Sequence, residues 1–150
     1  ASARAMYHRL LDHLIPFTPD RFSELGSSYL SSLGVTRQKA AYCINVAEAI
    51  LGGRLDLRAV SSMDDSEVIN ALTRIKGIGP WTAHIYLLMA LRRPDVWPPG
   101  DVALAHTVQK VKGLHEYPAA STLSKVAETW RPFRSVAARM LWHHYLSGKT

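Results

Sequence analysis

Apolar residues recur at helical spacing along nearly all of the 150 residues, and no stretch sustains an alternation of apolar and polar residues. This pattern indicates amphipathic helices and argues against half-buried strands. The expected helices cover residues 2–14, a short segment from Pro19, a long segment after Thr36, the segment after Asp64–Ser66, and residues 81–91, 101–112, 121–130 and 132–146. We therefore predict an all-α fold, a compact orthogonal helical bundle in one domain over residues 1–150.

Residues that favour helix ends mark several boundaries. Thr18 stands at the N-cap position of the short helix, and Thr36 stands at that of the long helix. Gly52 and Gly53 end the long helix, and we expect Gly52 to take the left-handed conformation. The segment 81–91 is apolar almost all round, so we expect it to be buried at the centre of the fold.

The charge balance favours a polyanionic partner. The formal net charge is +6 and the sequence pI is about 9.7. Such a chain suits nucleic acid above all, because lysine and arginine neutralise phosphates and release counterions. No apolar stretch approaches the roughly 18 residues that a membrane-spanning helix needs, so we expect no membrane partner.

Cysteine usage is consistent with an intracellular chain. Cys43 is the single cysteine, so an intrachain disulfide and a cysteine-ligated cluster within the chain are excluded. We interpret Cys43 as a small buried hydrophobic residue rather than a reactive thiol. The sequence begins at Ala1 without an initiator methionine or a leader, so we expect that its natural N-terminal part has been trimmed.

A glycine-rich turn between two helices, LTRIKGIGPWTA at residues 72–83, is the most informative segment. Gly77 and Gly79 allow positive φ values and a close approach of the backbone to another molecule. Pro80 suits the first turn of the next helix. The turn would leave backbone N–H groups at a positive helix N-terminus, where a phosphate oxygen can bind. For the two glycines alone, a tight helix–turn–helix corner without a ligand is an equal alternative.

Asp101 lies 20 residues after Trp81 (101 − 81), in the stretch DVWPPGDVALAHTV. A proline-rich loop that leads into a helix holds such a carboxylate at a fixed point. Aspartate is also a favoured N-cap residue, worth typically about 1 kcal/mol. From these residues alone, a purely structural cap and a functional carboxylate both remain open.

The hairpin and the carboxylate together resemble the helix–hairpin–helix (HhH-GPD) DNA glycosylase superfamily, especially the 3-methyladenine DNA glycosylase II (AlkA-like) branch. Within the hairpin the resemblance rests on Leu72, Ile75, Ile78 and the pair Thr82-Ala83. It extends from about the first helix to Tyr145. It implies that the bundle contains a helix–hairpin–helix DNA-binding motif.

In that family the hairpin also holds a monovalent cation on backbone carbonyl oxygens. The matching positions are Thr73, Ile75 and Gly77, so the resemblance implies a structural Na⁺ or K⁺ ion there and no required cofactor. Relatives with an iron–sulfur cluster use four cysteines, and Cys43 alone rules that cluster out.

Carried over from the family, Asp101 is the catalytic carboxylate that stabilises the cationic, oxocarbenium-like sugar as the base leaves. Relatives that also nick DNA carry a nucleophilic lysine where this chain has Trp81. An indole cannot form a Schiff base, and Lys76 lies on the wrong side of the turn to replace that lysine. We therefore predict hydrolysis of the N-glycosidic bond without lyase activity.

A base pocket follows from the same resemblance, because a glycosylase must hold a flipped base between aromatic or apolar surfaces. Trp81 and Trp142 match aromatic pocket positions, and Ile85 stands where the namesake enzyme has a tyrosine. An electron-rich indole attracts the positive charge of an alkylated purine. Ordinary core packing is the alternative role for both tryptophans.

Phosphate contacts are expected at the hairpin and at the start of the long helix. The expected contact residues are Lys76, Gly77, Ile78, Gly79, Thr82, Arg37 and Lys39. For Arg37 and Lys39, solvated surface charge is an equal alternative.

The resulting prediction is a monofunctional DNA glycosylase that removes alkylated purines, of the 3-methyladenine or 7-methylguanine type, from damaged double-stranded DNA. We expect a monomer in the cytoplasm and nucleoid, or in the nucleus of a eukaryote. The alternatives are a non-catalytic helix–hairpin–helix DNA-binding module, in which Asp101 is only a cap, and a helical domain that binds another protein. In the family, a residue just upstream of the first helix wedges into the duplex, and Ala1 is expected to begin after it.

Overall fold

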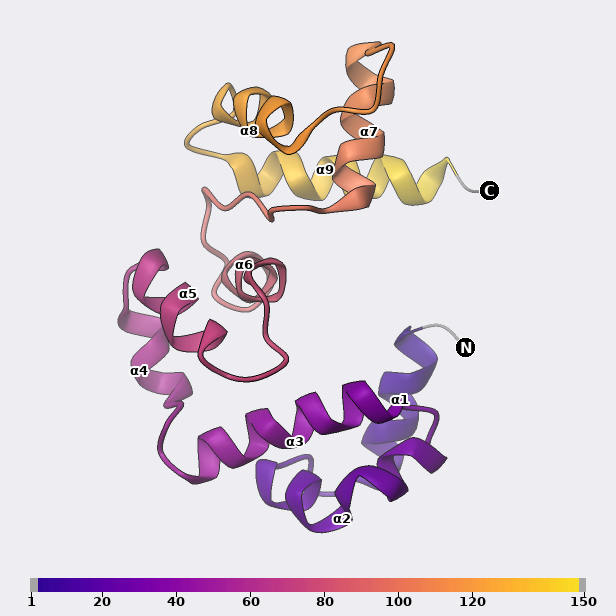
Figure 1. Ribbon diagram of the computed structural model, residues 1–150, viewed down its shortest axis with the longest axis vertical. Coiled ribbons are helices and arrows are strands. Elements are labelled where there is room, and N and C mark those ends of the chain that lie inside the picture. The colour runs from indigo at the N-terminus through magenta and orange to yellow at the C-terminus, as the bar shows by residue number, and fades with distance from the viewer. Residues whose placement is uncertain (1–2, 149–150) are drawn as a thin grey trace. The chain divides into compact units, whose positions relative to one another are not determined.

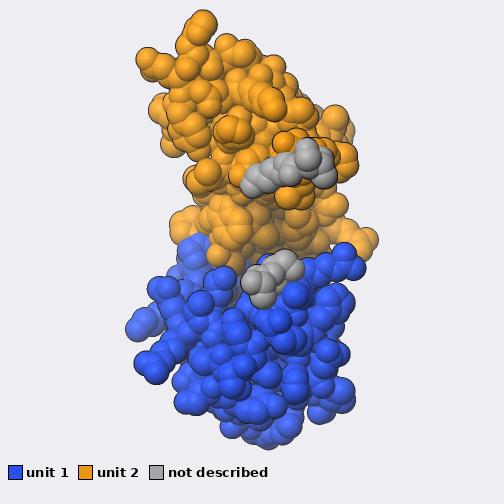
Figure 2. All heavy atoms as spheres, turned by 90° about the vertical axis from the view of Figure 1, so that its right-hand side faces the viewer, with its two compact units in different colours: residues 1–79 blue, residues 80–150 orange. Residues whose placement is uncertain are grey.

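The computed structural model describes residues 3–148, which form helices joined by turns and loops (Figure 1). No strand occurs among these residues, which confirms the predicted all-α class. The chain divides into two compact units, residues 1–79 and residues 80–150 (Figure 2). Within the described range, no helix has the length and apolar character that crossing a bilayer demands.

The helices fall into the two units in chain order. The first unit contains α1 (Ala3–His13), α2 (Pro19–Ser32), α3 (Arg37–Leu51), α4 (Leu57–Ser62) and α5 (Asp65–Thr73). The second unit contains α6 (Pro80–Met89), α7 (Val102–Lys112), α8 (Ala120–Glu128) and α9 (Arg134–Ser147). The predicted helix start at Ser2 lies outside the described residues.

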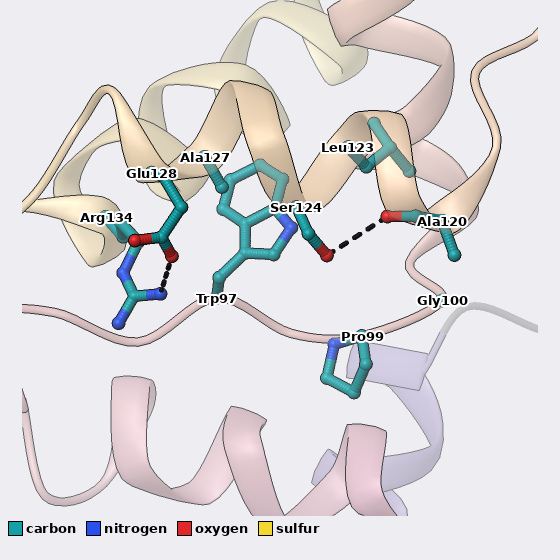
Figure 3. A pocket seen from close by; sticks show the side chains of 9 residues that line it. All are labelled: Trp97, Pro99, Gly100, Ala120, Leu123, Ser124, Ala127, Glu128 and Arg134. Carbon is teal, nitrogen blue, oxygen red and sulfur yellow. Dashed lines mark hydrogen bonds and ion pairs between the residues drawn. The ribbon is translucent and has the colours of Figure 1, made fainter.

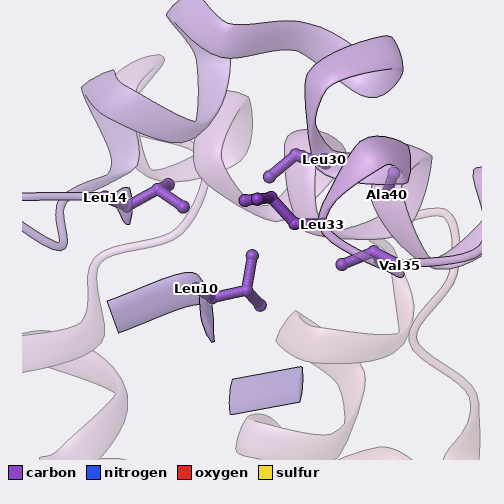
Figure 4. Close-up of a cluster of buried hydrophobic side chains, with 6 residues drawn as sticks. All are labelled: Leu10, Leu14, Leu30, Leu33, Val35 and Ala40. Atoms are coloured by element: carbon purple, nitrogen blue, oxygen red, sulfur yellow. The ribbon is translucent and has the colours of Figure 1, made fainter. Parts of the chain in front are cut away.

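A compact apolar cluster holds the first three helices together, and α2 packs along α3 (Figure 4). The cluster consists of Leu10, Leu14, Leu30, Leu33, Val35 and Ala40. Leu14, Leu30 and Ala40 are fully buried. Burying a leucine side chain contributes about 1.5–3 kcal/mol, so this cluster is a main source of stability for the first unit.

The observed caps agree with the prediction at Thr36 and differ from it at two other positions. The Thr36 hydroxyl accepts a hydrogen bond from Lys39 N at 3.3 Å. Thr18 occupies the N-cap position of α2, but its side chain makes no capping hydrogen bond, so the expected cap there is wrong. The expectation for Gly52 is also wrong: Gly52 has φ −81° and still donates to Glu48 O, and Gly53, with φ 67°, takes the left-handed conformation.

Helix α6 is buried on one face rather than all round. Ala83, Leu87 and Leu88 are buried, whereas Trp81 is 45% exposed and Met89 is 47% exposed. The prediction from an almost wholly apolar segment was therefore too strong, because apolar side chains also line exposed surfaces. The six residues of α4 are too few to produce a readable period, and no helix was predicted there.

In the second unit, α7 packs against α9 (Figure 1). Leu104 and Val108 form the buried face of α7, and Ala138 and Leu141 form that of α9. This packing brings the start of α7 beside the second half of α9, where the candidate site lies.

Asp95, in the loop after α6, stabilises the beginning of α9. The N-cap residue Phe133 provides no side-chain acceptor, and Asp95 Oδ1 accepts from Arg134 N at 3.3 Å in its place. The same carboxylate accepts from Arg134 Nε at 2.7 Å and from an Arg131 guanidinium nitrogen at 2.8 Å. The Arg134 hydrogen bond, helped by the charges of both arginines, lowers the pKa of Asp95 below its ordinary value, although partial burial opposes this shift.

We expect Asp95→Asn to lower the free energy of unfolding at pH 7 by about 1–2 kcal/mol, because charged hydrogen bonds are lost. The pKa of Asp95 is lower in the folded state than the roughly 3.9 of an unfolded chain. Its contribution is therefore present above about pH 4 and disappears as the pH falls through the folded-state pKa. Urea unfolding at pH 7, 5 and 3 measures this, with exposed Asp12→Asn as the control. A deficit of Asp95→Asn that stays constant over this pH range would contradict the assignment.

Candidate active site and nucleic-acid interface

Asp101 is a true N-cap of α7. Its Oδ1 accepts a hydrogen bond from Leu104 N at 2.8 Å, and its backbone is extended, with φ −75° and ψ 111°. The residue is only 8% exposed. A buried carboxylate needs several hydrogen-bond donors to offset its lost hydration, and one backbone N–H is not enough.

Two indole N–H groups supply the other donors. Trp81 Nε1, from α6, donates to Asp101 Oδ2 at 2.9 Å. Trp142 Nε1, from α9, donates to Asp101 Oδ1 at 3.3 Å. Three residues that the sequence singled out, Trp81, Asp101 and Trp142, thus meet at one carboxylate. Asp101 and Trp142 stand 41 positions apart in the sequence. Hydrogen bonds to a charged group contribute about 1.5–3 kcal/mol each, so the position of the carboxylate is firmly held.

A shallow surface depression opens beside this carboxylate. Its lining residues are Trp81, Gly100, Asp101, Val102, Ala103 and Tyr145. Trp142 and Ile85, which were expected to form the base pocket, are half-buried and do not belong to this lining. Tyr145 was not singled out in the sequence, although its place three residues after Trp142 on one helix face could have indicated it.

The loop before Asp101 is fixed from several directions. Val96 N donates to Ser135 Oγ at 2.9 Å, and that hydroxyl donates to Arg93 O at 2.6 Å. The Trp97 ring packs against Trp130 with centroids 5.5 Å apart. Gly100, with φ 68°, turns the chain into the helix. Ser135 at the start of α9 therefore holds the first part of the loop that leads to Asp101.

A second cavity lies on the other side of this loop, against α8 (Figure 3). The Trp97 ring points from the loop toward Ser124 and Ala127, whereas the Pro99 ring lies on the opposite side of the loop ribbon (Figure 3). Ser124 Oγ is already bonded to Ala120 O at 3.0 Å. Glu128 and Arg134, at its edge, are likewise joined to each other at 3.0 Å.

The glycine turn is shaped by a side chain of α3. Gly77 has φ 105°, and a Cβ atom placed there would lie 2.2 Å from Cγ of Tyr42, so no larger residue fits. Gly79 has an ordinary φ, and a Cβ atom placed there would meet no atom within 4 Å. Ile78 N donates to Ile75 O at 3.0 Å and closes the turn. Of the two glycines, only Gly77 is required by the packing of the described residues.

Helix α3 also holds the backbone of the turn. Asn45 Nδ2 donates to Lys76 O at 2.9 Å, and Gln38 Nε2 donates to the Tyr42 hydroxyl at 2.8 Å. Neither Tyr42 nor Asn45 was singled out in the sequence, since both stand more than 30 positions before the turn without a local motif. Their spacing of three on one helix face is the only available signal.

The carbonyl groups expected to hold a cation suit that role by their chemistry. Thr73 ends α5, where the last carbonyl groups of a helix lack intrahelical partners. Ile75 O accepts one hydrogen bond, from Ile78 N, and a carbonyl oxygen has two lone pairs. Lys76 O already accepts a hydrogen bond from Asn45 Nδ2, so it would not compete with these oxygens for the cation. Hard carbonyl oxygens are suitable ligands for an alkali cation.

The remaining expected contact residues lie at the surface. Lys76 and Thr82 are exposed, and Ile78 is half-buried. Arg37 and Lys39 are exposed in the first turn of α3. All of these side chains are accessible to a ligand in their own unit.

Neither the cysteine nor a cluster of metal-ligating side chains adds a second reactive centre among the described residues. Burial raises the pKa of the Cys43 thiol above its ordinary value, and the half-buried thiol is therefore a poor nucleophile. Over residues 3–148, no three His, Cys, Asp or Glu side chains gather in a way that could hold a metal ion.

Comparison with known proteins places the chain among DNA repair proteins. It is 28% identical over 123 residues to the DNA-3-methyladenine glycosylase of Bacillus subtilis (strain 168), a match covering 82% of this chain and 41% of the relative. It is 29% identical over 126 residues to DNA-3-methyladenine glycosylase 1 of Schizosaccharomyces pombe, covering 83% and 55%. The chain spans about half the length of the curated relatives it matches.

Two solved structures share the fold. A 3-methyladenine DNA glycosylase of Schizosaccharomyces pombe, in complex with abasic DNA, superposes with a TM-score of 0.87 at 28% identity, over 93% of this chain and 70% of that one. The DNA-3-methyladenine glycosidase of Bacillus halodurans gives a TM-score of 0.78 at 30% identity, over 97% and 69%. The family description "HhH-GPD superfamily base excision DNA repair protein" matches residues 1–132. The chain therefore belongs to the HhH-GPD superfamily of base excision DNA repair proteins.

Proposed function

We propose that this chain is a monofunctional DNA glycosylase that hydrolyses the N-glycosidic bond of alkylated purines flipped out of double-stranded DNA. The observation that carries the proposal is the Asp101 carboxylate, held by Leu104 N, Trp81 Nε1 and Trp142 Nε1 beside an open depression. A residue that only caps α7 needs the hydrogen bond from Leu104 N and needs neither of the two indole hydrogen bonds. The names of the relatives, which act on 3-methyladenine in DNA, support the same conclusion.

The chemistry asked of Asp101 is electrostatic. As the bond between base and sugar breaks, positive charge develops on the sugar ring, and a fixed carboxylate nearby stabilises it. The three N–H groups fix the carboxylate before the substrate arrives, so little reorganisation is needed in the transition state. Water then completes the hydrolysis. An alkylated purine already carries positive charge and leaves as a neutral base, so one well-placed carboxylate is sufficient.

Trp81 determines the type of reaction. It stands at the start of α6, and its indole N–H is engaged with Asp101 at 2.9 Å. An indole cannot attack the sugar to form a Schiff base, so water is the nucleophile. The product is an abasic site in an uncut strand.

Binding to double-stranded DNA would use the hairpin as a phosphate clamp. Gly77, Ile78 and Gly79 directly precede α6 in the sequence, and the side chains of Lys76 and Thr82 are exposed. Arg37 and Lys39 would neutralise further phosphates. The net charge of +6 supports this role. The chain would act as a monomer, inside the cell, where its DNA substrate lies.

The carbonyl oxygens of Thr73, Ile75 and Gly77 would hold a Na⁺ or K⁺ ion. When bound, such an ion would add positive charge to the turn. Tyr42 and Asn45 set the path of the backbone that presents these oxygens.

The decisive test is base release from duplex DNA that contains 7-methylguanine or 3-methyladenine. We expect free methylated base from the unsubstituted chain, with strands that stay uncut until alkali is added. Asp101→Asn should lower the single-turnover rate at least about a hundredfold, equivalent to about 2.7 kcal/mol, because the charge that stabilises the transition state is lost. Its DNA affinity should stay within about threefold.

Each outcome separates the competing roles. Release that is unaffected by Asp101→Asn would make Asp101 a cap only and would overturn the mechanism. DNA binding by both proteins without release from either would instead favour a non-catalytic DNA-binding module. A strand cut without alkali, with trapping of a covalent complex by borohydride, would overturn the monofunctional assignment.

Trp142→Phe tests the hydrogen bond to Asp101 separately from the indole's apolar surface. Phenylalanine keeps an aromatic ring on α9 but cannot donate to Oδ1. We expect the release rate to fall about fivefold to tenfold, with DNA affinity unchanged, since one charged hydrogen bond is lost. Trp130→Phe is the matched control, because it keeps an aromatic ring against Trp97 and removes no hydrogen bond to Asp101 in the described part of the chain. Equal rates for both variants would contradict the positioning role.

The two hairpin glycines give opposite predictions. Gly79→Ala adds a methyl group in open space, so we expect unchanged stability but a DNA affinity about fivefold to tenfold weaker, because the backbone can no longer approach a phosphate closely. Gly77→Ala should lower the free energy of unfolding by more than about 1 kcal/mol through its clash with Tyr42. Fluorescence anisotropy measures the DNA affinity, and urea unfolding measures the stability. Gly148→Ala is the control, because a Cβ atom placed there would lie 3.5 Å from His144 O, an ordinary van der Waals distance. Unchanged affinity of Gly79→Ala would place the phosphate contact elsewhere.

A further inference from the structure

Helix α9 bonds to the loop before Asp101 at two separate places. Its first residues, Arg134 and Ser135, bond to the beginning of the loop. Trp142, in the second half of the helix, bonds to Asp101 at the end of the loop. An α-helix rises about 1.5 Å per residue, so these two places lie about 12 Å apart on one rigid element. A shift at the first place reaches the second if the loop between them is stiff.

Arg134 holds Asp95, at the beginning of this loop, through its guanidinium group. It donates to both carboxylate oxygens of Asp95, at 2.7 and 3.0 Å, and to the Asp95 backbone carbonyl at 2.9 Å. A further bond of 3.0 Å joins it to Glu128, the last residue of α8 (Figure 3). The Arg134 side chain is 16% exposed. A planar guanidinium in such a bidentate contact fixes the orientation of its partner as well as the distance.

The loop over residues 95–101 has little freedom to absorb a shift. Pro98 and Pro99 have φ angles that their rings restrict, and Pro98 is fully buried. Val96 is 3% exposed, and its N–H donates to Ser135 Oγ at 2.9 Å. A displacement at the first residue of the loop would therefore be passed along the chain to the carboxylate at its end.

We propose that Arg134 is a positioning residue for the reaction: by fixing Asp95, it sets where the Asp101 carboxylate lies relative to its two indole donors. This assignment rests on the proposed glycosylase function. Arg134 acts through the loop and does not need to touch the substrate. A second arginine, Arg131, bonds to one carboxylate oxygen of Asp95 at 2.8 Å, and its side chain is 52% exposed. Only the arginine that also holds the Asp95 backbone should affect Asp101.

One test observes the indole N–H groups at Asp101 and needs no activity. The chain has four tryptophans, so a ¹H–¹⁵N correlation spectrum contains four indole signals, which Trp→Phe variants assign. Asp101→Asn removes the charge of the acceptor and defines the direction in which the Trp81 and Trp142 signals move. We expect Arg134→Met to move these two signals in that direction. Arg131→Met, the matched control, should leave them in place.

The other test is single-turnover release of 7-methylguanine from duplex DNA. Arg134→Met should lower the rate about tenfold, with DNA affinity within about threefold, because a misplaced carboxylate stabilises the transition state less well. Arg131→Met should stay within about twofold of the unsubstituted chain. Arg134→Lys keeps a positive charge beside Asp95 but lacks the planar fork, so its rate should lie between those two.

A double-mutant cycle tests whether Arg134 acts through the carboxylate. In the Asp101→Asn background, Arg134→Met should cause under about twofold further loss. A tenfold loss in both backgrounds would show that Arg134 acts away from Asp101 and would overturn the assignment. Urea unfolding verifies that each variant is folded in the assay. If Arg134→Met is unfolded, Arg134→Lys takes its place, with Arg131→Lys as its control.

The outcomes separate this assignment from the function on which it rests. If the Trp81 and Trp142 signals of the Arg134 variant match those of the unsubstituted chain, the assignment is overturned. Equal changes in the Arg131 and Arg134 variants would show that the charge of the ion-pair network matters in general, which would also overturn it. If the unsubstituted chain releases no base, the proposed function fails, and the indole signals still decide whether Arg134 positions the Asp101 carboxylate.

Discussion

A buried carboxylate imposes the strictest requirement on the second unit. Asp101 is 8% exposed, and such a group is stable only where enough N–H donors converge on it. The donors come from the start of α7, from Trp81 on α6 and from Trp142 on α9. These three helices must therefore keep a fixed arrangement within the unit. The packing of α7 on α9 and the bracing of the preceding loop by Ser135 both serve that arrangement.

The first unit supports the hairpin in a similar way, through a helix distant in sequence. Helix α3 places the Tyr42 ring where a side chain at position 77 would lie, and Asn45 binds the Lys76 carbonyl. The apolar cluster around Leu30 fixes α3 in turn. In each unit, the segment with proposed function is a loop or turn, and its geometry is set by side chains on well-packed helices.

Local signals allowed the fold class to be predicted and drew attention to the hairpin and Asp101, whereas the roles expected of Asp101, Trp81 and Trp142 came from the family resemblance. Helical periodicity indicated an all-α chain, and the hairpin and Asp101 stood out because glycine, proline and aspartate have strong positional preferences. The indole bonds to Asp101, the Tyr42 contact and Tyr145 could not be predicted, because each depends on tertiary packing between segments without a shared local pattern. The left-handed residue at Gly53 rather than Gly52 has the same origin: the helix ends where its last hydrogen bond to Glu48 forms, and composition does not determine that position.

The contact between Gly77 and Tyr42 also bears on the thermodynamics of ligand association. The Tyr42 ring fills the space beside Gly77 and the Lys76 carbonyl is bonded to Asn45, so side chains of α3 brace the backbone of the turn without any ligand. Association then loses little backbone entropy, in contrast to a glycine loop that must become ordered on binding. A turn of this kind binds as a rigid template, so changes in its affinity should arise from the contacts themselves and be visible mainly in the dissociation rate.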